Sequence, residues 1–195
     1  MNSVLEREIL FTGIGGQGVQ LAAKILALAA TLEDLEVMSL GTYGGTMRGG
    51  NTDATVVIGK APIISPPIVS NAWSAIVVHP RYFEPIAHKI RKTGLVLVDS
   101  DLLEEPLPVA KEILLPIQAT TLAREADAPK AAALLLLGAY VAATEIVSHD
   151  ALENALDGSL PSYRRQTLET NLHALRAGRD AVEPLSNPAW TSEAA

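Results

Sequence analysis

The stretch GIGGQGVQ, residues 13–20, constrains the fold of this chain more than any other. It follows the aliphatic run REILFTG, which is typical of a strand, and it leads into VQLAAKILALAATL, where apolar residues recur at helical spacing. A strand joined to a helix by such a turn is the opening unit of many α/β folds. Gly13, Gly15 and Gly18 also fit the pattern G-x-G-x-x-G, the fingerprint of dinucleotide-binding proteins.

The dinucleotide interpretation can be tested further along the chain. NAD binding requires an acidic residue about 20 positions on, at the end of the second strand, to hold a ribose hydroxyl. The predicted second strand, EVMSLG, ends in Ser39–Gly41, and the nearby acids, of which Glu36 is the last, come before that end. NAD(P) binding by a stand-alone oxidoreductase is therefore kept only as the alternative function.

The glycines of the first loop allow two interpretations. Glycines at this point let the backbone turn sharply and present bare N–H groups at the beginning of a helix, where the partial positive charge favours a phosphate or a carboxylate. Alternatively, they only allow the strand and the helix to pack closely. The loop alone does not decide between an anion site and a packed turn.

Length and composition predict one domain with an aliphatic core. The 195 residues suit a single domain, and the sequence is 48% hydrophobic but only 4% aromatic. Strands and helices alternate, which predicts an α/β fold: a Rossmann-like, mostly parallel sheet with flanking helices and a helical C-terminal part. We place this domain at residues 1–182 and a flexible C-terminal tail at residues 183–195.

Charge and cysteine content exclude several classes of protein. The net charge of −7 argues against salt-dependent binding to nucleic acid or anionic lipid. The chain has no cysteine, which excludes disulfides, thiolate zinc sites and cysteine-ligated iron–sulfur clusters within it. The N-terminus does not resemble a signal peptide, and the apolar run 131–144 is too short to span a bilayer. We expect a cytoplasmic protein.

Local patterns predict the remaining elements. After the first strand and helix, strands are predicted at 36–41, 53–59, 74–80, 95–101 and 111–117. Helices are predicted at 81–94, 131–144, 151–158 and 162–182.

The second glycine loop, TYGGTMRGGN, follows the predicted second strand. It places Arg48 between two glycine pairs, and a guanidinium offers paired donors to a carboxylate or phosphate. Ligands of such sheets approach the carboxyl ends of the strands, so both glycine loops and the ends of the fourth and fifth strands should converge there. We favour a ligand or partner contact for Arg48. The alternative is an ion pair within the chain.

Together the two loops carry a resemblance to a known family. GIGGQGVQLAAKILA, TYGGTMRGGNTDATVVIG and IISP resemble the gamma component of the 2-oxoacid:ferredoxin oxidoreductases. The resemblance continues in RKTGLVLVDSDLL, LLLLGAYVAAT and NLHALRAG, and covers nearly the whole chain apart from its ends. The specific feature is the combination of Gly-Gln-Gly after the first strand with Arg-Gly-Gly after the second.

The resemblance implies a function within a complex. Enzymes of this family convert a 2-oxoacid to its acyl-coenzyme A with thiamine diphosphate, Mg²⁺ and iron–sulfur clusters, and transfer electrons to ferredoxin or a similar acceptor. The alpha, beta and ferredoxin-like subunits hold these cofactors. The gamma subunit, a Rossmann-like domain, completes the active site on the coenzyme A side and is inactive alone. A structural spacer without ligand contact is a third possibility.

The resemblance also assigns site residues, which we expect to contact coenzyme A or the substrate carboxylate. No catalytic residue and no metal ligand is assigned. The assigned residues are Gly13, Gly15, Gly16, Gln17, Gly18, Tyr43, Arg48, Gly49, Gly50 and Asn51.

Two departures from the family pattern concern the substrate and the packing. Many relatives have an aspartate just before the fourth strand, where this chain has Asn71–Trp73, and an asparagine at the start of the buried helix, where it has alanine. The Arg-Gly-Gly form is closer to the 2-oxoglutarate type than to the pyruvate type.

Other polar residues near the same edge have structural explanations. His79, at the end of the fourth strand, could act in acid–base chemistry, but an element-capping residue is the favoured interpretation. Asp99 and Asp101 could bind Mg²⁺, but we expect them to cap the segment that follows. The apolar loop APIISPPIVSNAW either folds over the sheet edge or forms an interface.

Overall fold

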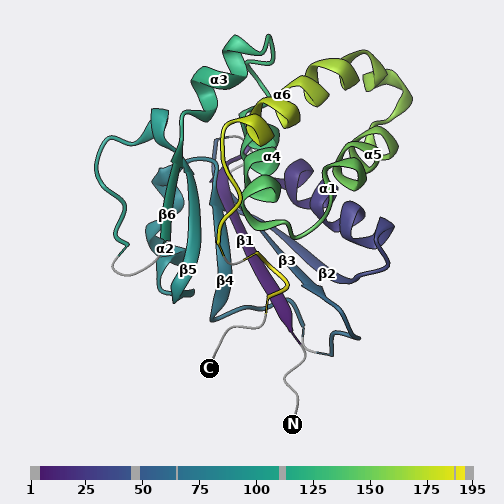
Figure 1. Cartoon of the computed structure of the whole chain (residues 1–195). Helices are drawn as coiled ribbons and strands as arrows, with labels where there is room; N and C mark the ends of the chain where they lie inside the picture. The colour runs from purple at the N-terminus through teal and green to yellow at the C-terminus, as the bar shows by residue number, and fades with distance from the viewer. Residues whose placement is uncertain (1–4, 45–48, 65, 110–112, 187, 192–195) are drawn as a thin grey trace.

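A six-stranded sheet forms the centre of the chain, in the order β2-β3-β1-β4-β5-β6 (Figure 1). The computed structural model describes residues 5–44, 49–64, 66–109, 113–186 and 188–191, with the backbone alone at residues 43 and 162–164. The strands are β1 (Glu6–Ile14), β2 (Glu36–Tyr43), β3 (Asn51–Gly59), β4 (Ala72–Val77), β5 (Ile90–Asp99) and β6 (Ile113–Ile117).

Helices flank this sheet. They are α1 (Val19–Leu32), α2 (Glu84–Ala87), α3 (Ala119–Glu125), α4 (Ala132–Thr144), α5 (His149–Ser159) and α6 (Leu168–Asp180), with 3₁₀ turns η1 (Pro80–Tyr82), η2 (Ser100–Leu102) and η3 (Ser162–Thr167). In Figure 1, α1, α4, α5 and α6 lie on one face of the sheet, and α2 lies on the other face beside β5.

The strand directions confirm the predicted α/β fold with a mostly parallel sheet. β1 pairs in parallel with β4, β4 with β5, and β5 with β6. β3 is antiparallel to both of its neighbours, β1 and β2, so it alone opposes the other strands of the sheet. Only residues 44–50 separate β2 from β3, a connection too short for the crossover that a parallel pair needs.

The sheet has a different apolar cluster on each face. Ile9 and Phe11 of β1 face α1 and α4, and both are fully buried. Leu10, between them, points to the other face and packs in a cluster with Phe83 and Val96. Because side chains alternate along a strand, β1 is apolar on both sides, as a central strand between two layers requires.

Helices α4 and α6 cross at very short distance through two glycines. A Cβ atom on Gly138 would lie 2.0 Å from the carbonyl oxygen of Leu175, and one on Gly178 would lie 1.9 Å from that of Leu135. Each glycine therefore faces the backbone of the opposite helix. This contact fixes α6 over the buried helix α4.

The helix predicted over residues 81–94 is wrong in its second half. α2 ends at Ala87, and β5 begins at Ile90, which pairs with Ala72 of β4. A Cβ atom on Gly94 would lie 3.1 Å from the carbonyl oxygen of Trp73, so this glycine lets β5 approach β4 closely rather than ending a helix.

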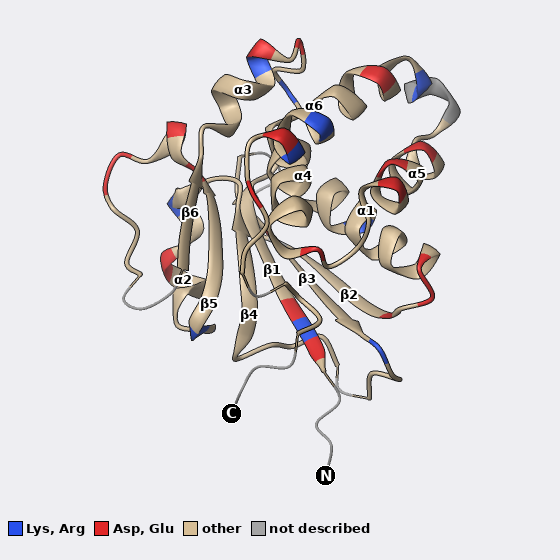
Figure 2. Ribbon diagram, viewed as in Figure 1, with Lys and Arg blue, Asp and Glu red and all other residues tan. Residues whose placement is uncertain are grey.

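The C-terminal part is more divided than the sequence suggests. Helix α3 was not predicted, and the predicted last helix is split into η3 and α6. Arg176 of α6 donates two hydrogen bonds to the carboxylate of Glu153 on α5, at 2.9 and 2.6 Å. The cationic side of α6 therefore pairs in part with acids of the same chain, and Figure 2 shows acids along α5 and both signs of charge along α6.

The segment after α6 is tied to the core where it is described. The guanidinium of Arg7 on β1 donates to the carbonyl oxygen of Ala189, and the N–H of Ala189 donates to Thr144 at 2.7 Å. Trp190 donates through its indole N–H to Ile146 at 3.0 Å. The described part of the predicted tail thus contacts the core, and the boundary placed at residue 182 stays a prediction. We name residues 183–186 and 188–191 the C-terminal strap.

The apolar loop between β3 and β4 combines both predicted behaviours. Ile63 and Trp73 are buried, whereas Ile64 and Ile68 are 92% and 80% exposed. The loop is thus anchored on the sheet by some of its apolar residues and presents others to solvent. Its role as an interface stays a prediction.

His149, the first residue of α5, is expected to make folding stability depend on pH. Burial and the nearby Arg179 guanidinium lower the pKa of this histidine below its usual 6.5, and its Nε2 atom is buried without a hydrogen-bond partner among the described residues. The unfolded chain therefore binds a proton more readily, and stability is lost as pH falls below about 6.5. In urea unfolding, His149→Gln should lose less stability than the wild type between pH 7.5 and 5.5. Equal losses would contradict this.

Candidate functional site

The two glycine loops meet at the carboxyl edge of the sheet, as the sequence predicts. The N–H of Gly15, just after β1, donates to the carbonyl oxygen of Gly50, just before β3, at 2.8 Å. The hydroxyl of Tyr82 in η1 reaches the carbonyl oxygen of Gly49 at 3.5 Å. The connection after β1 leads to α1 on one face, and that after β4 leads to α2 on the other, so the loops lie where the chain switches faces.

The beginning of α1 has unneutralised positive character. Its N-cap is Gly18 with φ of 87°, no side chain caps it within the described residues, and its first turn holds no acid. Gly16 has φ of 100° and is exposed, so glycine at both positions relieves strain that a side chain would introduce. The first N–H groups of a 14-residue helix are thus available to an anion.

The glycines of the first loop have different tasks. A Cβ atom on Gly13 would lie 2.8 Å from Val19 and 3.2 Å from Val78, so this glycine serves close packing of strand and helix. By contrast, Gly16 and Gly49 have no neighbouring atoms within 4 Å of such a position. The packed-turn interpretation therefore holds for Gly13, whereas contact of the other glycines with a ligand stays a prediction.

Gln17 and Asn51 organise the loops from within. The side-chain oxygen of Gln17 accepts the N–H of Ile14 at 2.9 Å and so closes the first loop on itself. Asn51 donates to the carboxylate of Asp53 at 2.7 Å, while its own Oδ1 is buried without a partner among the described residues. An orphaned buried acceptor next to the open glycines suits a donor supplied from outside.

Arg48 is the predicted residue with the strongest expected contact to a ligand. Arg48 lies outside the described residues, as do residues 45–47, and for Tyr43 only the backbone at the end of β2 is described. Gly49, Gly50 and Asn51, which follow Arg48, do lie beside the first loop. The contact of Arg48 with a ligand stays a prediction.

Sequence reasoning missed three residues that hold the site together. Gln20 on α1 donates to the carbonyl oxygen of Asp53 at 2.6 Å, and Thr12 on β1 donates to the Asp53 carboxylate at 2.7 Å. Asp53 therefore links β1, β3 and α1 under the two loops. The polar residues 51–53 at the start of β3, which is aliphatic only from Val56 onward, were the available signal.

His79 has the favoured structural role. Its Nδ1 atom accepts the N–H of Arg81 at 3.2 Å and caps η1. Burial, followed by the Arg81 guanidinium, lowers the pKa of His79, so the ring is neutral at pH 7. It borders a cleft of about 740 Å³ beside Arg81, Glu84, Glu104 and Leu107.

The two aspartates after β5 are capping residues, as expected. One carboxylate oxygen of the fully buried Asp99 accepts the N–H groups of Ala119 and Thr120 at 3.1 and 3.3 Å. Asp101 accepts the N–H of Thr121 at 2.6 Å. Both therefore neutralise the beginning of α3. The described residues contain no group of three or more histidine or acidic side chains that could hold a metal ion.

In the described part of the chain, no helix combines the length and apolar character needed to cross a bilayer. The buried helix α4 has 13 residues. It is surrounded by α1, α3, α5, α6 and the sheet.

Comparison with known proteins gives one consistent family. The model of the family described as "Pyruvate ferredoxin/flavodoxin oxidoreductase" matches residues 8–181. The chain is 33% identical to the 2-oxoglutarate synthase subunit KorC of Methanocaldococcus jannaschii, covering 93% of this chain and 96% of that protein. It is 28% identical to the pyruvate/ketoisovalerate oxidoreductases common subunit gamma of Pyrococcus furiosus, covering 90% and 97%.

Solved structures similar to this chain come from the same group of enzymes. The gamma subunit of a keto/oxoacid ferredoxin oxidoreductase from Geobacter sulfurreducens superposes with a TM-score of 0.74 at 27% identity, covering 90% of this chain and 97% of that one. A 2-oxoglutarate:ferredoxin oxidoreductase from Magnetococcus marinus shares the fold with a TM-score of 0.80 at 19% identity, and this chain covers 33% of it. The chain therefore belongs to the pyruvate ferredoxin/flavodoxin oxidoreductase family, as a subunit of the gamma type.

Proposed function

We propose that this chain works in a 2-oxoacid:ferredoxin oxidoreductase complex, where the crevice formed by its two glycine loops binds an anionic group of coenzyme A or of the 2-oxoacid. The supporting observation is the uncapped beginning of α1 next to Gly49–Asn51, at the switch point of the sheet. The Arg-Gly-Gly loop favours 2-oxoglutarate as substrate, although the identities to 2-oxoglutarate synthase subunits (30–33%) and to pyruvate/ketoisovalerate gamma subunits (28–32%) overlap.

The electrostatics of the crevice suit an anion. The aligned peptide dipoles of α1 concentrate about half a positive charge at its first turn, and this attraction acts within one turn of the helix end. Arg48, in the adjoining loop, would add a full charge and paired N–H donors. The phosphate groups of coenzyme A and the carboxylate of a 2-oxoacid each match such a site.

The chemistry of the reaction belongs to other subunits in this proposal. The chain has no cysteine, so cysteine ligands of iron–sulfur clusters must come from a partner. Thiamine diphosphate, bound by partner subunits, would supply the decarboxylation chemistry. This chain would orient coenzyme A or the 2-oxoacid and should be inactive alone.

The test uses the complex reconstituted from all its subunits. Arg48→Ala should raise the KM for coenzyme A or for the 2-oxoacid by about 10- to 100-fold, because a hydrogen bond to a charged group contributes about 1.5–3 kcal/mol. Gly15→Ala should act in the same direction, because its methyl group would occupy space beside the bound anion. The loop itself should be unchanged, since the new Cβ atom would lie 3.5 Å from the carbonyl oxygen of Gly50, an ordinary contact distance. Steady-state kinetics with a viologen acceptor measures both.

Gly158→Ala provides the matched control, because this position on α5 has open space and lies outside the crevice. It should leave both KM values unchanged. Normal assembly and turnover of Arg48→Ala would end the proposal. Tight binding of NADH by the isolated chain, seen in a fluorescence titration, would instead support the alternative of a stand-alone NAD(P) enzyme.

A further inference from the structure

β2 forms an edge of the sheet with little protection against pairing, since its one charged residue, Glu36, stands at its first position. It is the terminal strand, and its eight residues include no proline, lysine or arginine (Figure 2). The opposite edge, β6, has only five residues, one of which is Pro116. Edge strands of soluble proteins are commonly interrupted by proline or lysine because their free N–H and C=O groups otherwise pair with another chain.

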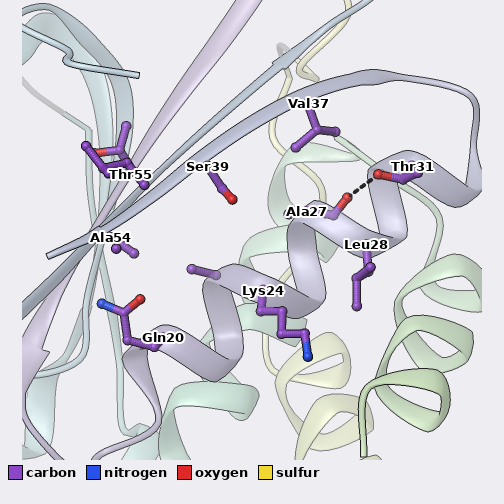
Figure 3. Close-up of a pocket in the computed structure, with 12 residues that line it drawn as sticks. Gln20, Lys24, Ala27, Leu28, Thr31, Val37, Ser39, Ala54 and Thr55 are labelled. Carbon is purple, nitrogen blue, oxygen red and sulfur yellow. Dashed lines mark hydrogen bonds between the residues drawn. The ribbon is translucent and has the colours of Figure 1, made fainter. Parts of the chain in front are cut away.

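A groove runs beside this open edge, between β2 and α1 (Figure 3). It encloses about 330 Å³, with Val37, Ser39 and Gly41 on the strand side and Lys24 and Leu28 on the helix side. Side chains of a strand added to β2 would alternate between this groove and the opposite face of the sheet.

Apolar side chains are exposed on both sides of the edge. On the helix side, Leu28 is 36% exposed, and Leu32, one turn further along α1, is 59% exposed. On the other face of the sheet, Leu40 is 41% exposed and lies opposite Thr55 of β3. No helix packs on that face of β2 in the described part of the fold. An incoming strand could therefore bury apolar surface on both of its faces.

The charge of the groove indicates the chemistry of its occupant. Lys24 is exposed and makes no ion pair with any described residue. An acidic side chain on the added strand would compensate it. A second copy of this chain is a poorer occupant, since each copy carries a net charge of −7 and the two would repel.

We propose that β2 receives an extended segment of a partner subunit as a seventh strand, with apolar side chains at alternate positions and a carboxylate facing Lys24. The backbone of β2 supplies the hydrogen bonds, and the groove beside α1 selects the side chains. This interface rests on the proposed function only in that the chain works inside a complex. It is separate from the glycine-loop crevice.

The experiment compares lysine substitutions on the two edges. Leu40→Lys places a charge on the open edge, and Leu114→Lys is its control on β6, where the native leucine is 38% exposed against 41% for Leu40. Each full-length variant is mixed with the remaining subunits, and binding is measured by mass photometry and hydrogen exchange. Leu40→Lys should weaken assembly at least tenfold and Leu114→Lys should not. Because both leucines are half-exposed, the melting temperatures of the isolated variants should stay within about 2 °C of the wild type.

Hydrogen exchange decides how the partner binds. The outward N–H groups of residues 36–43 should exchange freely in the isolated chain, because β2 is an edge strand, and should be protected at least tenfold in the complex. Unchanged exchange there, or equal assembly of both variants, would overturn the proposal. So would a dimer of the isolated chain that Leu40→Lys abolishes while assembly with the other subunits stays normal. Protection of β2 with normal kinetics of Arg48→Ala would leave this interface standing and reject the proposed function.

Discussion

Replacing Gly178 by alanine is expected to lower the free energy of unfolding by about 3 kcal/mol or more, at the upper end of overpacking effects. The new Cβ atom would lie 1.9 Å from the carbonyl oxygen of Leu135 and 2.9 Å from the N–H nitrogen of Ala139. Both are backbone atoms of α4, so a change of rotamer cannot relieve the clash and the helices must separate. Alanine's better helix propensity, about 1 kcal/mol, offsets only part of this.

Thermal unfolding followed by circular dichroism measures the effect. A loss of 3 kcal/mol corresponds to a fall in Tm of about 6–12 °C for a domain of this size. Gly158→Ala is the control, because the same substitution on α5 meets no atom within 4 Å and should leave Tm unchanged or raise it. A Tm of Gly178→Ala within 2 °C of the wild type would show that α4 and α6 do not cross this closely.

The second large effect is expected for Asp99→Ala. The carboxylate is fully buried and accepts the N–H groups of Ala119 and Thr120, and also the Thr120 hydroxyl at 2.6 Å. Its removal leaves these donors unsatisfied next to the sheet, and each buried donor without a partner costs about 1–3 kcal/mol. We therefore expect a loss of about 3 kcal/mol or more, with α3 detached first.

Asp101→Ala separates this effect from ordinary capping. Among the described residues, Asp101 accepts one N–H, the exposed one of Thr121, so its loss should cost about 1 kcal/mol. Urea denaturation of both variants gives the comparison. If Asp101→Ala proved as damaging as Asp99→Ala, burial of the Asp99 carboxylate would not be the source of its importance.

Local sequence patterns predicted those elements that are determined by their own residues. The first strand, its glycine turn and α1 follow from residues 7–32 alone, since strand, turn and helix patterns are all complete there. The predicted parallel character also follows, because most strands are separated by segments long enough for a crossover. The reversal of β3 could be deduced only from the short connection between residues 44 and 50.

Errors arose where distant residues decide local structure. β5 begins at Ile90 because that residue pairs with Ala72 of β4, although the helical spacing and terminal cations of 81–94 favour a helix. Helix α3 has no side-chain cap of its own and depends on Asp99, 20 positions earlier. Neither pairing partner nor cap can be read from the segment itself.

In the candidate site, too, some features follow from the sequence and others depend on residues far apart in the chain. The two glycine loops follow β1 and β2, which run in the same direction, so their meeting at the carboxyl edge of the sheet could be predicted. The links made by Asp53 with Thr12 and Gln20 depend on the register of β1 against β3 and on the rotation of α1. A sequence pattern does not contain those quantities.

The C-terminal strap has a consequence for how the domain is synthesised. Arg7 on the central strand stacks on Trp73 at 4.8 Å and donates to the carbonyl oxygens of Ala189 and Thr191. Arg7 precedes Ala189 by 182 positions, so its buried guanidinium receives these acceptors only after residue 191 has left the ribosome. Native packing of β1 should therefore be completed only once the C-terminal strap has emerged, and nascent chains halted within α6 should remain open to proteases.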